Sequence, residues 1–113
     1  MDNSTAVTAL AALAQSSRLA IYRLLVQRGP EGFAAGELAE HLGIPGPTLS
    51  FHLKALTQVG LIAARRESRH LYYSACFERM NALLAYLTEN CCALGTVCDT
   101  ACAPTAKPAG RAA

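Results

Sequence analysis

The sequence predicts a single, mostly α-helical domain with a small β-hairpin. Apolar residues recur at helical spacing in five segments, and two short apolar and aromatic runs flank one charged turn. At 113 residues, 52% hydrophobic and 16% charged, the chain has room for one modest core and is too apolar to be disordered. It contains no apolar run long enough to cross a bilayer, so we expect no membrane partner. The N-terminal segment "AVTALAALAQ" lacks the preceding positive charges of a secretory signal, so we expect a cytoplasmic protein.

Two helices are predicted in the first quarter of the chain. The apolar residues at helical spacing in the first helix are Val7, Leu10, Leu13 and Ala14. Ser16 or Ser17 can cap the second helix, which ends near Gly29 and Pro30. The residues of the second helix expected to face inward are Leu19, Ile21, Leu24 and Leu25.

Two short helices separated by a tight Gly/Pro turn follow. The first covers residues 34–44 and is closed by Gly43, and the second covers residues 45–60 and stops at Gly60. Prolines at the start of the second suit a first helical turn. The apolar positions are Leu38, Ala39 and Leu42 in the first helix and Leu49, Leu53 and Leu56 in the second. This pair forms a helix-turn-helix unit.

A two-stranded hairpin is predicted next, with residues 61–64 and 70–74 on either side of the polar turn "RRESR" at residues 65–69. An isolated hairpin is only marginally stable, so we expect this one to pack against the helices.

The last helix is predicted over residues 77–90. Its apolar face carries Met80, Leu83, Leu84 and Leu87, with Cys91 continuing the line, and points at the core or a partner. Residues 1–92 then form the folded domain. Residues 93–113 are expected to be a flexible, cysteine-containing tail, because they end in Ala, Pro and Gly without periodicity.

The second helix of a helix-turn-helix lies in the major groove of DNA and presents its N-terminal residues to base edges. The positions expected to be exposed there are Pro47, Thr48, Ser50, Phe51, His52 and Lys54. Thr48 and Ser50 can bond to bases or phosphates, and Lys54 can meet a phosphate. Phe51 either packs on a thymine methyl group or belongs to the core or an interface. His52 either donates to DNA or packs locally.

The hairpin turn places Arg65, Arg66 and Arg69 at a narrow tip. Directly after a recognition helix, such a tip suits contact with the DNA backbone or minor groove. The alternative is a turn that only confers solubility.

The segments "ALAQSSRLAIYRLL", "GELAEHLGIPGPTLSFHLKALTQVGLI" and "ARRESRHLYYS" together resemble the ArsR/SmtB family of winged helix-turn-helix repressors, over about residues 6 to 90. The resemblance implies a homodimer joined by the first and last helices. It also implies binding to double-stranded operator DNA, with release when a metal or metalloid binds.

The ligand sites of this family occur on different elements. The "GELAEHLG" helix lacks the Cys-x-Cys of many arsenite-responsive members, and the last helix lacks the Asp and His pairs of zinc-responsive members. What remains is Cys91, Cys92 and Cys98, with Cys102 as a possible fourth ligand. The Cys-Cys-x5-Cys order is similar to a relocated arsenite site in some members. Adjacent helical side chains point about 100° apart, so Cys91 and Cys92 can share an ion only where the helix frays or distorts.

Clustered thiolates favour a soft ion. Three cysteines without a nearby histidine favour As(III) or Sb(III) as inducer, and the alternative is zinc, cadmium or lead held by all four cysteines. The cysteines could instead pack a helix end or act as a redox switch. Cys76 stands apart and is expected in the core.

We expect no organic cofactor, and we do not expect the protein to be an enzyme. The chain shows no Cys-x-x-Cys, phosphate loop or acid/base pair. The remaining alternative is a constitutive DNA-binding protein whose cysteines are incidental.

Overall fold

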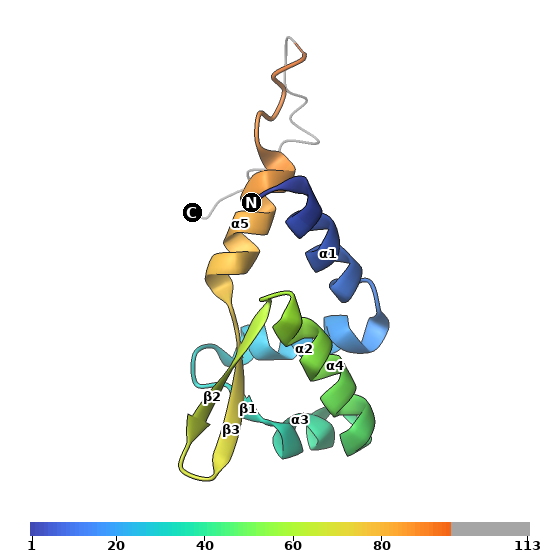
Figure 1. Ribbon diagram of the computed structural model, residues 1–113, viewed down its shortest axis with the longest axis vertical. Helices are drawn as coiled ribbons and strands as arrows, with labels where there is room; N and C mark the ends of the chain where they lie inside the picture. Colours follow the sequence, from blue (N-terminus) through green and yellow to red (C-terminus); the bar gives the residue numbers. More distant parts are fainter. Residues whose placement is uncertain (96–113) are drawn as a thin grey trace.

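The structure, a computed structural model, describes residues 1–95. Along this part of the chain the elements are α1 (Asn3–Leu13), α2 (Ser16–Arg28), β1 (Phe33–Ala34), α3 (Ala35–Leu42), α4 (Gly46–Gln58), β2 (Ile62–Glu67), β3 (His70–Ala75) and α5 (Phe77–Thr88). α1 and α5 occupy one end of the molecule, and α3 and the tip of the β2–β3 hairpin occupy the other (Figure 1). The predicted mostly helical fold with a hairpin is confirmed. Cys98, Cys102 and most of the predicted tail lie outside the described residues.

Helix α1 turns its smallest residues toward the core. The carboxylate of Asp2 caps it by accepting from the backbone N–H of Thr5 at 2.8 Å. The buried residues of α1 are Ala6, Ala9 and Ala12. The larger Val7 and Leu10, by contrast, are 56% and 40% exposed. Alanines permit close packing on α2 and α4, while an apolar surface remains on the outside.

Helix α2 corrects two predictions. Its N-cap is Gln15, whose side chain accepts from the backbone N–H of Arg18 at 2.9 Å, and not a serine. Leu19 is 44% exposed, whereas Ile21 and Leu25 are fully buried. Residues two apart on a helix point about 200° from one another, so Leu19 and Ile21 cannot face the same core.

The helix-turn-helix unit is confirmed. α3 ends at Gly43, whose φ of 64° is the left-handed conformation of a helix C-cap. α4 follows after Pro45, with Pro47 in its first turn. The apolar positions predicted for α4 are all buried, with exposed fractions of 2% or less at Leu49, Leu53 and Leu56. α4 is therefore fixed against the core by one face and presents the opposite face outward.

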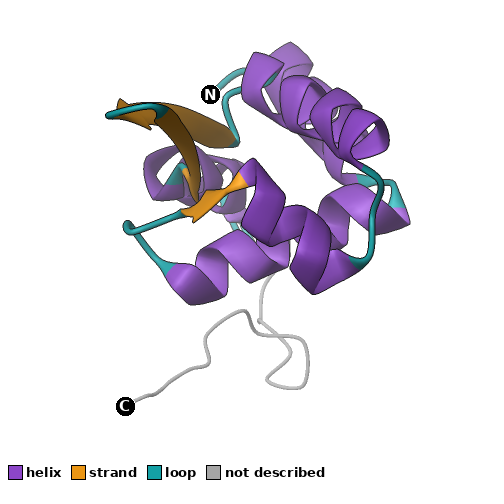
Figure 2. Cartoon of the chain, turned by 90° about the horizontal axis from the view of Figure 1, so that it is seen from below, coloured by secondary structure: helices purple, strands orange, loops and turns teal. Residues whose placement is uncertain are grey.

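The sheet is antiparallel, in the order β1-β3-β2, with the short strand lying among the helices and the hairpin extending outward from them (Figure 2). Two features differ from expectation. β1 was not predicted, because two residues carry no periodic signal. The hairpin turn is also shorter than "RRESR", since Arg65 pairs with Tyr72 and Arg66 with Leu71. Both arginines therefore belong to β2 and not to the turn.

Helix α5 starts directly at the base of the hairpin, where the backbone N–H of Cys76 donates to the carbonyl of Leu61 at 2.8 Å. Leu83 is buried, but Leu84 and Leu87 are each 53% exposed. α5 is tied to the start of α1 by a hydrogen bond from the Tyr86 hydroxyl to Asn3 Oδ1 at 3.1 Å. Among the described residues, no helix is long and apolar enough to cross a membrane.

Candidate functional site

The outward face of α4 carries most of the side chains predicted to read DNA. The residues of that set that are exposed are Pro47, Thr48, Ser50, Phe51 and Lys54. Phe51 is the most conspicuous, because its large apolar ring is 63% exposed. These side chains lie on the opposite side of α4 from its buried leucines, as required of a helix that packs with one face and binds with the other.

His52 does not belong to that face, and the prediction that it is exposed is wrong. It is only 7% exposed, and its Nδ1 accepts a hydrogen bond from Nε of Arg18 at 3.1 Å. Position 52 lies three residues after Leu49 and four before Leu56, so helical spacing alone places it on the buried side. Local packing, the other interpretation of this histidine, is what the structure shows.

Arg18 is a contact of the recognition helix that the sequence did not reveal. It comes from the first turn of α2, and its guanidinium carbon lies 5.5 Å from the centroid of the Phe51 ring. The Phe51 and His52 rings meet edge to face, with centroids 5.7 Å apart. No local signal links residues 34 positions apart, so this cluster of Arg18, Phe51 and His52 exists only through the packing of α2 on α4.

Arg65 was expected to project from the hairpin tip, but its guanidinium is hydrogen-bonded within the protein. Its Nη1 donates to the carbonyl of Pro30 at 3.2 Å and its Nη2 to that of Glu31 at 3.1 Å. Its Nε lies 3.3 Å from the carboxylate of Glu67. Since position 65 is inside β2, this side chain fastens the hairpin to the loop after α2.

Arg66 and Arg69 are the arginines of the hairpin whose charged groups are available to a ligand. Neither has a hydrogen bond or ion pair within the part of the chain that the structure describes. Together with His70 they line an open hollow of about 310 Å³ that reaches to Ala35 and Gly36 at the start of α3. Positive charge therefore gathers at the end of the molecule where α3 and the hairpin tip meet.

The cysteine pair lies at the other end. α5 stops at Thr88, and Cys91 and Cys92 occupy the turns that follow it. Cys91 therefore does not continue the helical line of Leu84 and Leu87 as predicted. Asn90 and Cys92 adopt left-handed φ values of 58° and 64°. Both cysteines are exposed, and their Sγ atoms lie 3.6 Å apart.

This departure from helical geometry is the condition that two adjacent thiols must meet to hold one ion. With a metal–sulfur bond of about 2.3 Å and a tetrahedral angle, two ligating sulfurs lie about 3.8 Å apart. The observed separation of 3.6 Å is close to that value. No group of three or more His, Cys, Asp or Glu suited to a metal is found within residues 1–95, and the other predicted ligands, Cys98 and Cys102, lie outside them.

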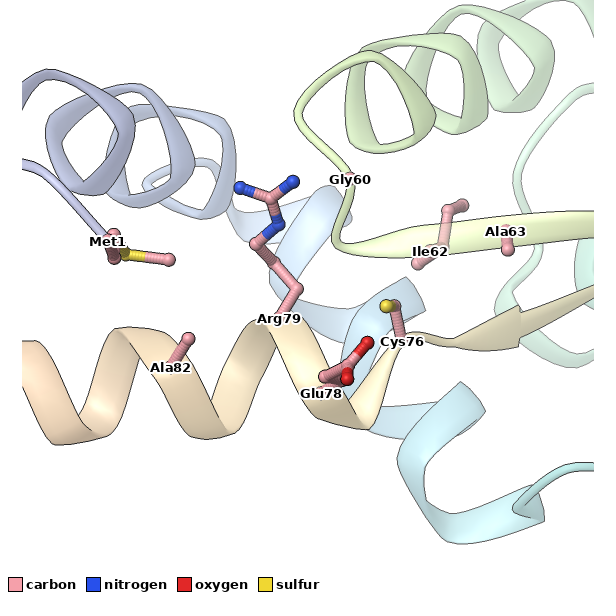
Figure 3. Close-up of a pocket in the computed structure, with 8 residues that line it drawn as sticks. All are labelled: Met1, Gly60, Ile62, Ala63, Cys76, Glu78, Arg79 and Ala82. Atoms are coloured by element: carbon pink, nitrogen blue, oxygen red, sulfur yellow. The ribbon is translucent and has the colours of Figure 1, made fainter.

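Cys76 is separate from this pair. It is half-buried before the first residue of α5, and a helix of 12 residues, about 18 Å long, stands between it and the pair. Its sulfur lines an open pocket of about 520 Å³, into which Arg79 also reaches toward Gly60 (Figure 3). Burial, with a smaller contribution from the nearby Cys76, raises the pKa of the Tyr22 phenol.

Known proteins similar to this chain are named as transcriptional regulators or repressors. A family profile described as a helix-turn-helix domain matches residues 13–65. An HTH-type transcriptional regulator of Escherichia coli, YgaV, is 33% identical over 87 residues, which cover 77% of this chain and 86% of that protein. An uncharacterized HTH-type transcriptional regulator of Bacillus subtilis, YceK, is 44% identical over 63 residues, but the match spans only 56% of this chain and 62% of that protein.

A probable mercury resistance operon repressor of Streptomyces lividans is 38% identical over 63 residues, 56% of this chain and 48% of that protein. Among solved structures, the homodimeric winged helix-turn-helix DNA-binding domain of a possible ArsR-family regulator from Mycobacterium bovis is 30% identical. It superimposes with a TM-score of 0.62 over 85% of this chain and 89% of that one. These relatives are transcriptional regulators and not enzymes.

Proposed function

Because the chain belongs to the ArsR family of winged helix-turn-helix transcriptional regulators, we propose that it is an arsenite- or antimonite-responsive repressor. In this proposal a homodimer binds operator DNA and releases it when the trivalent metalloid binds Cys91, Cys92 and Cys98. The observation that supports Cys91 and Cys92 as two of these ligands is that their sulfur atoms lie 3.6 Å apart after the end of α5.

DNA binding is assigned to the outward face of α4 and to the hairpin. Thr48, Ser50 and Phe51 face outward near the start of α4 and are the candidates for base contacts. Lys54, Arg66 and Arg69 are exposed and supply phosphate contacts, which account for most of the salt-dependent affinity. Arg65 does not join them, since both of its terminal nitrogens donate to backbone carbonyls within the protein.

Dimerisation is assigned to the apolar surface that α1 and α5 leave uncovered. Val7, Leu10, Leu84 and Leu87 are each 40% or more exposed, and α1 and α5 lie together at one end of the molecule (Figure 1). Burial of such side chains in a two-fold interface is favourable. The Mycobacterium bovis relative is homodimeric, which supports a homodimer here.

The proposed dimer places the thiols where they can influence DNA binding. Cys91 and Cys92 begin three residues beyond the end of α5, so drawing Cys98 toward them constrains the end of that helix. α5 is continuous with β3, and its N-terminus is bonded to Leu61 at the base of the hairpin. A change in the packing of α5 can therefore alter the spacing of the two DNA-reading units. Release requires that ion binding favour the DNA-incompetent geometry, and the coupling must be equal in both directions.

The second candidate is a zinc-, cadmium- or lead-responsive repressor that uses Cys102 as a fourth ligand. The mercury resistance named for the Streptomyces relative also fits a thiophilic ion. Three thiolates without a histidine suit the pyramidal coordination of As(III) or Sb(III), whereas zinc prefers four ligands. The third candidate, a constitutive DNA-binding protein, predicts no response to any ion.

Operator-binding titrations with arsenite, and in parallel with zinc, cadmium and lead, separate these candidates. Duplexes bound by the protein are first selected from a randomised pool, and binding is then followed by fluorescence anisotropy with increasing arsenite. The wild type should release DNA, and Cys92→Ser should keep its DNA affinity but lose the response. Cys76→Ser is the matched control and should respond as the wild type does. Release that persists in Cys92→Ser would overturn the ligand assignment.

A further inference from the structure

Arg18 contacts the recognition helix although it lies outside the helix-turn-helix unit. Its Nε donates to Nδ1 of His52 at 3.1 Å, and its guanidinium carbon lies 5.5 Å from the centre of the Phe51 ring. That distance is within the range of about 6 Å over which a cation is attracted to an aromatic face. The backbone of Arg18 is held as well, since its N–H donates to the capping side chain of Gln15.

These contacts restrain an exposed aromatic ring. The Phe51 side chain is 63% exposed, yet it has the Arg18 guanidinium on one side and the His52 ring, tilted by 61°, on another. An exposed phenylalanine with no such neighbours would sample several rotamers and would lose that freedom on binding. A ring that is already held loses less, so the arrangement is a preorganised apolar surface.

We propose that Arg18 is a positioning residue that holds Phe51 for contact with the 5-methyl group of a thymine. The thymine methyl is the apolar group among the base edges of the major groove, and an aromatic ring on a recognition helix is suited to contact it. The positive charge of Arg18 is also compatible with nearby phosphates, as an acidic side chain would not be. This inference rests on the proposed DNA binding and adds a chemical group that the protein reads.

The test compares thymine with uracil, which differ only by that methyl group. A duplex is selected from a randomised pool with the wild-type protein, and each thymine is then replaced by deoxyuridine in turn. Loss of one methyl contact should weaken wild-type binding about fourfold, and loss of the symmetry-related pair about 15-fold. In Phe51→Ala the same replacement should have no effect.

Variants of Arg18 isolate its role. Arg18→Gln places an N–H donor where Nε stands, so the bond to His52 can persist, but removes the guanidinium over the ring. It should fold with wild-type circular dichroism. Its affinities for the thymine duplex and the deoxyuridine duplex should be nearly equal, so that their ratio is close to one. Arg18→Lys should restore part of the ratio, because an ammonium group is also attracted to an aromatic face. Arg23→Gln, an exposed arginine of α2, is the control and should retain the wild-type ratio.

The outcomes are distinguishable. If Arg18→Gln weakens all duplexes equally and leaves the ratio unchanged, Arg18 does not position Phe51 and the inference is wrong. If wild-type binding is indifferent to every thymine methyl, the inference is also wrong while the proposed DNA binding stands. If selection recovers no duplex for the wild type, the proposed function itself fails.

Discussion

The guanidinium of Arg65 donates to the main-chain carbonyl of Pro30 at 3.2 Å, across 35 positions of sequence. The bond joins the hairpin to the loop that follows α2, and a second bond to Glu31 reinforces it. Two adjacent arginines of one strand therefore have different tasks. Arg65 holds the hairpin in place, and Arg66 remains available to a polyanion.

Substitution should separate these two tasks. Arg66→Ala should reduce the dependence of log Kd on log salt concentration by about two for a dimer, because each lost phosphate contact contributes about 0.9. Arg65→Ala should leave the salt slope unchanged and lower the free energy of unfolding by about 1 kcal/mol, since the lost bonds are partly exposed. Anisotropy titrations and urea denaturation measure the two quantities. Equal effects of both variants on the salt slope would contradict the assignment.

The proposed dimer predicts a specific sensitivity at α5. Leu84→Glu places a charge in the apolar surface formed with Val7, Leu10 and Leu87, and burying an unpaired carboxylate is costly. We expect the variant to sediment as a monomer and to bind DNA more weakly. Val26→Glu is the matched control, because Val26 on α2 is 40% exposed but outside that surface. A dimeric Leu84→Glu would place the interface elsewhere.

The ligand count can be measured directly. X-ray absorption of the arsenite-loaded protein should show three sulfur neighbours around arsenic in the wild type and in Cys102→Ser. Cys98→Ser should lose one of them and weaken arsenite binding. Four sulfur neighbours on zinc or cadmium, lost in Cys102→Ser, would favour the alternative inducer.

The hydroxyl of Tyr22 is buried and has no hydrogen-bond partner among the described residues. Because removal of an unsatisfied buried group relieves its desolvation cost, Tyr22→Phe should stabilise the protein by about 1 kcal/mol in urea denaturation.

The same residue predicts a pH dependence. Burial raises the pKa of Tyr22 in the folded state, so its neutral form is favoured there. Ionisation of Tyr22 therefore leaves the free energy of unfolding unchanged below the pKa of an unfolded tyrosine. It lowers that free energy as the pH rises from there through the folded value. The wild type should therefore lose more stability than Tyr22→Phe above about pH 10. If the free energies of unfolding of the wild type and Tyr22→Phe fall in parallel above that pH, the phenol is not desolvated in the folded state.

Two glycines with similar backbone angles should respond differently to alanine. Gly32 has a φ of 75°, and a Cβ there would lie 2.5 Å from the carbonyl oxygen of Tyr73. Gly43 has a φ of 64° with open space around it. Gly43→Ala should cost about 1 kcal/mol for the left-handed conformation alone, and Gly32→Ala at least about 2 kcal/mol. Equal losses of stability would show that the contact with β3 relaxes freely.

The sequence by itself determined the elements whose signals are local. Leucines at 49, 53 and 56 define the buried face of α4 because helical periodicity is a property of neighbouring residues. Gly43 ends α3 for a similarly local reason, the ease of a left-handed backbone. The order of helices, the turn between α3 and α4, and the hairpin followed from such signals.

Only the tertiary structure decided which polar groups are committed to the fold and which are free. The buried Nδ1 of His52 is hydrogen-bonded because Arg18 of another helix supplies a donor, and Arg65 is engaged because a distant loop presents two carbonyls. β1 pairs with β3 without any periodic signal of its own. These contacts join residues more than 30 positions apart, and the energy of each depends on distance and direction in space, which one-dimensional spacing does not contain.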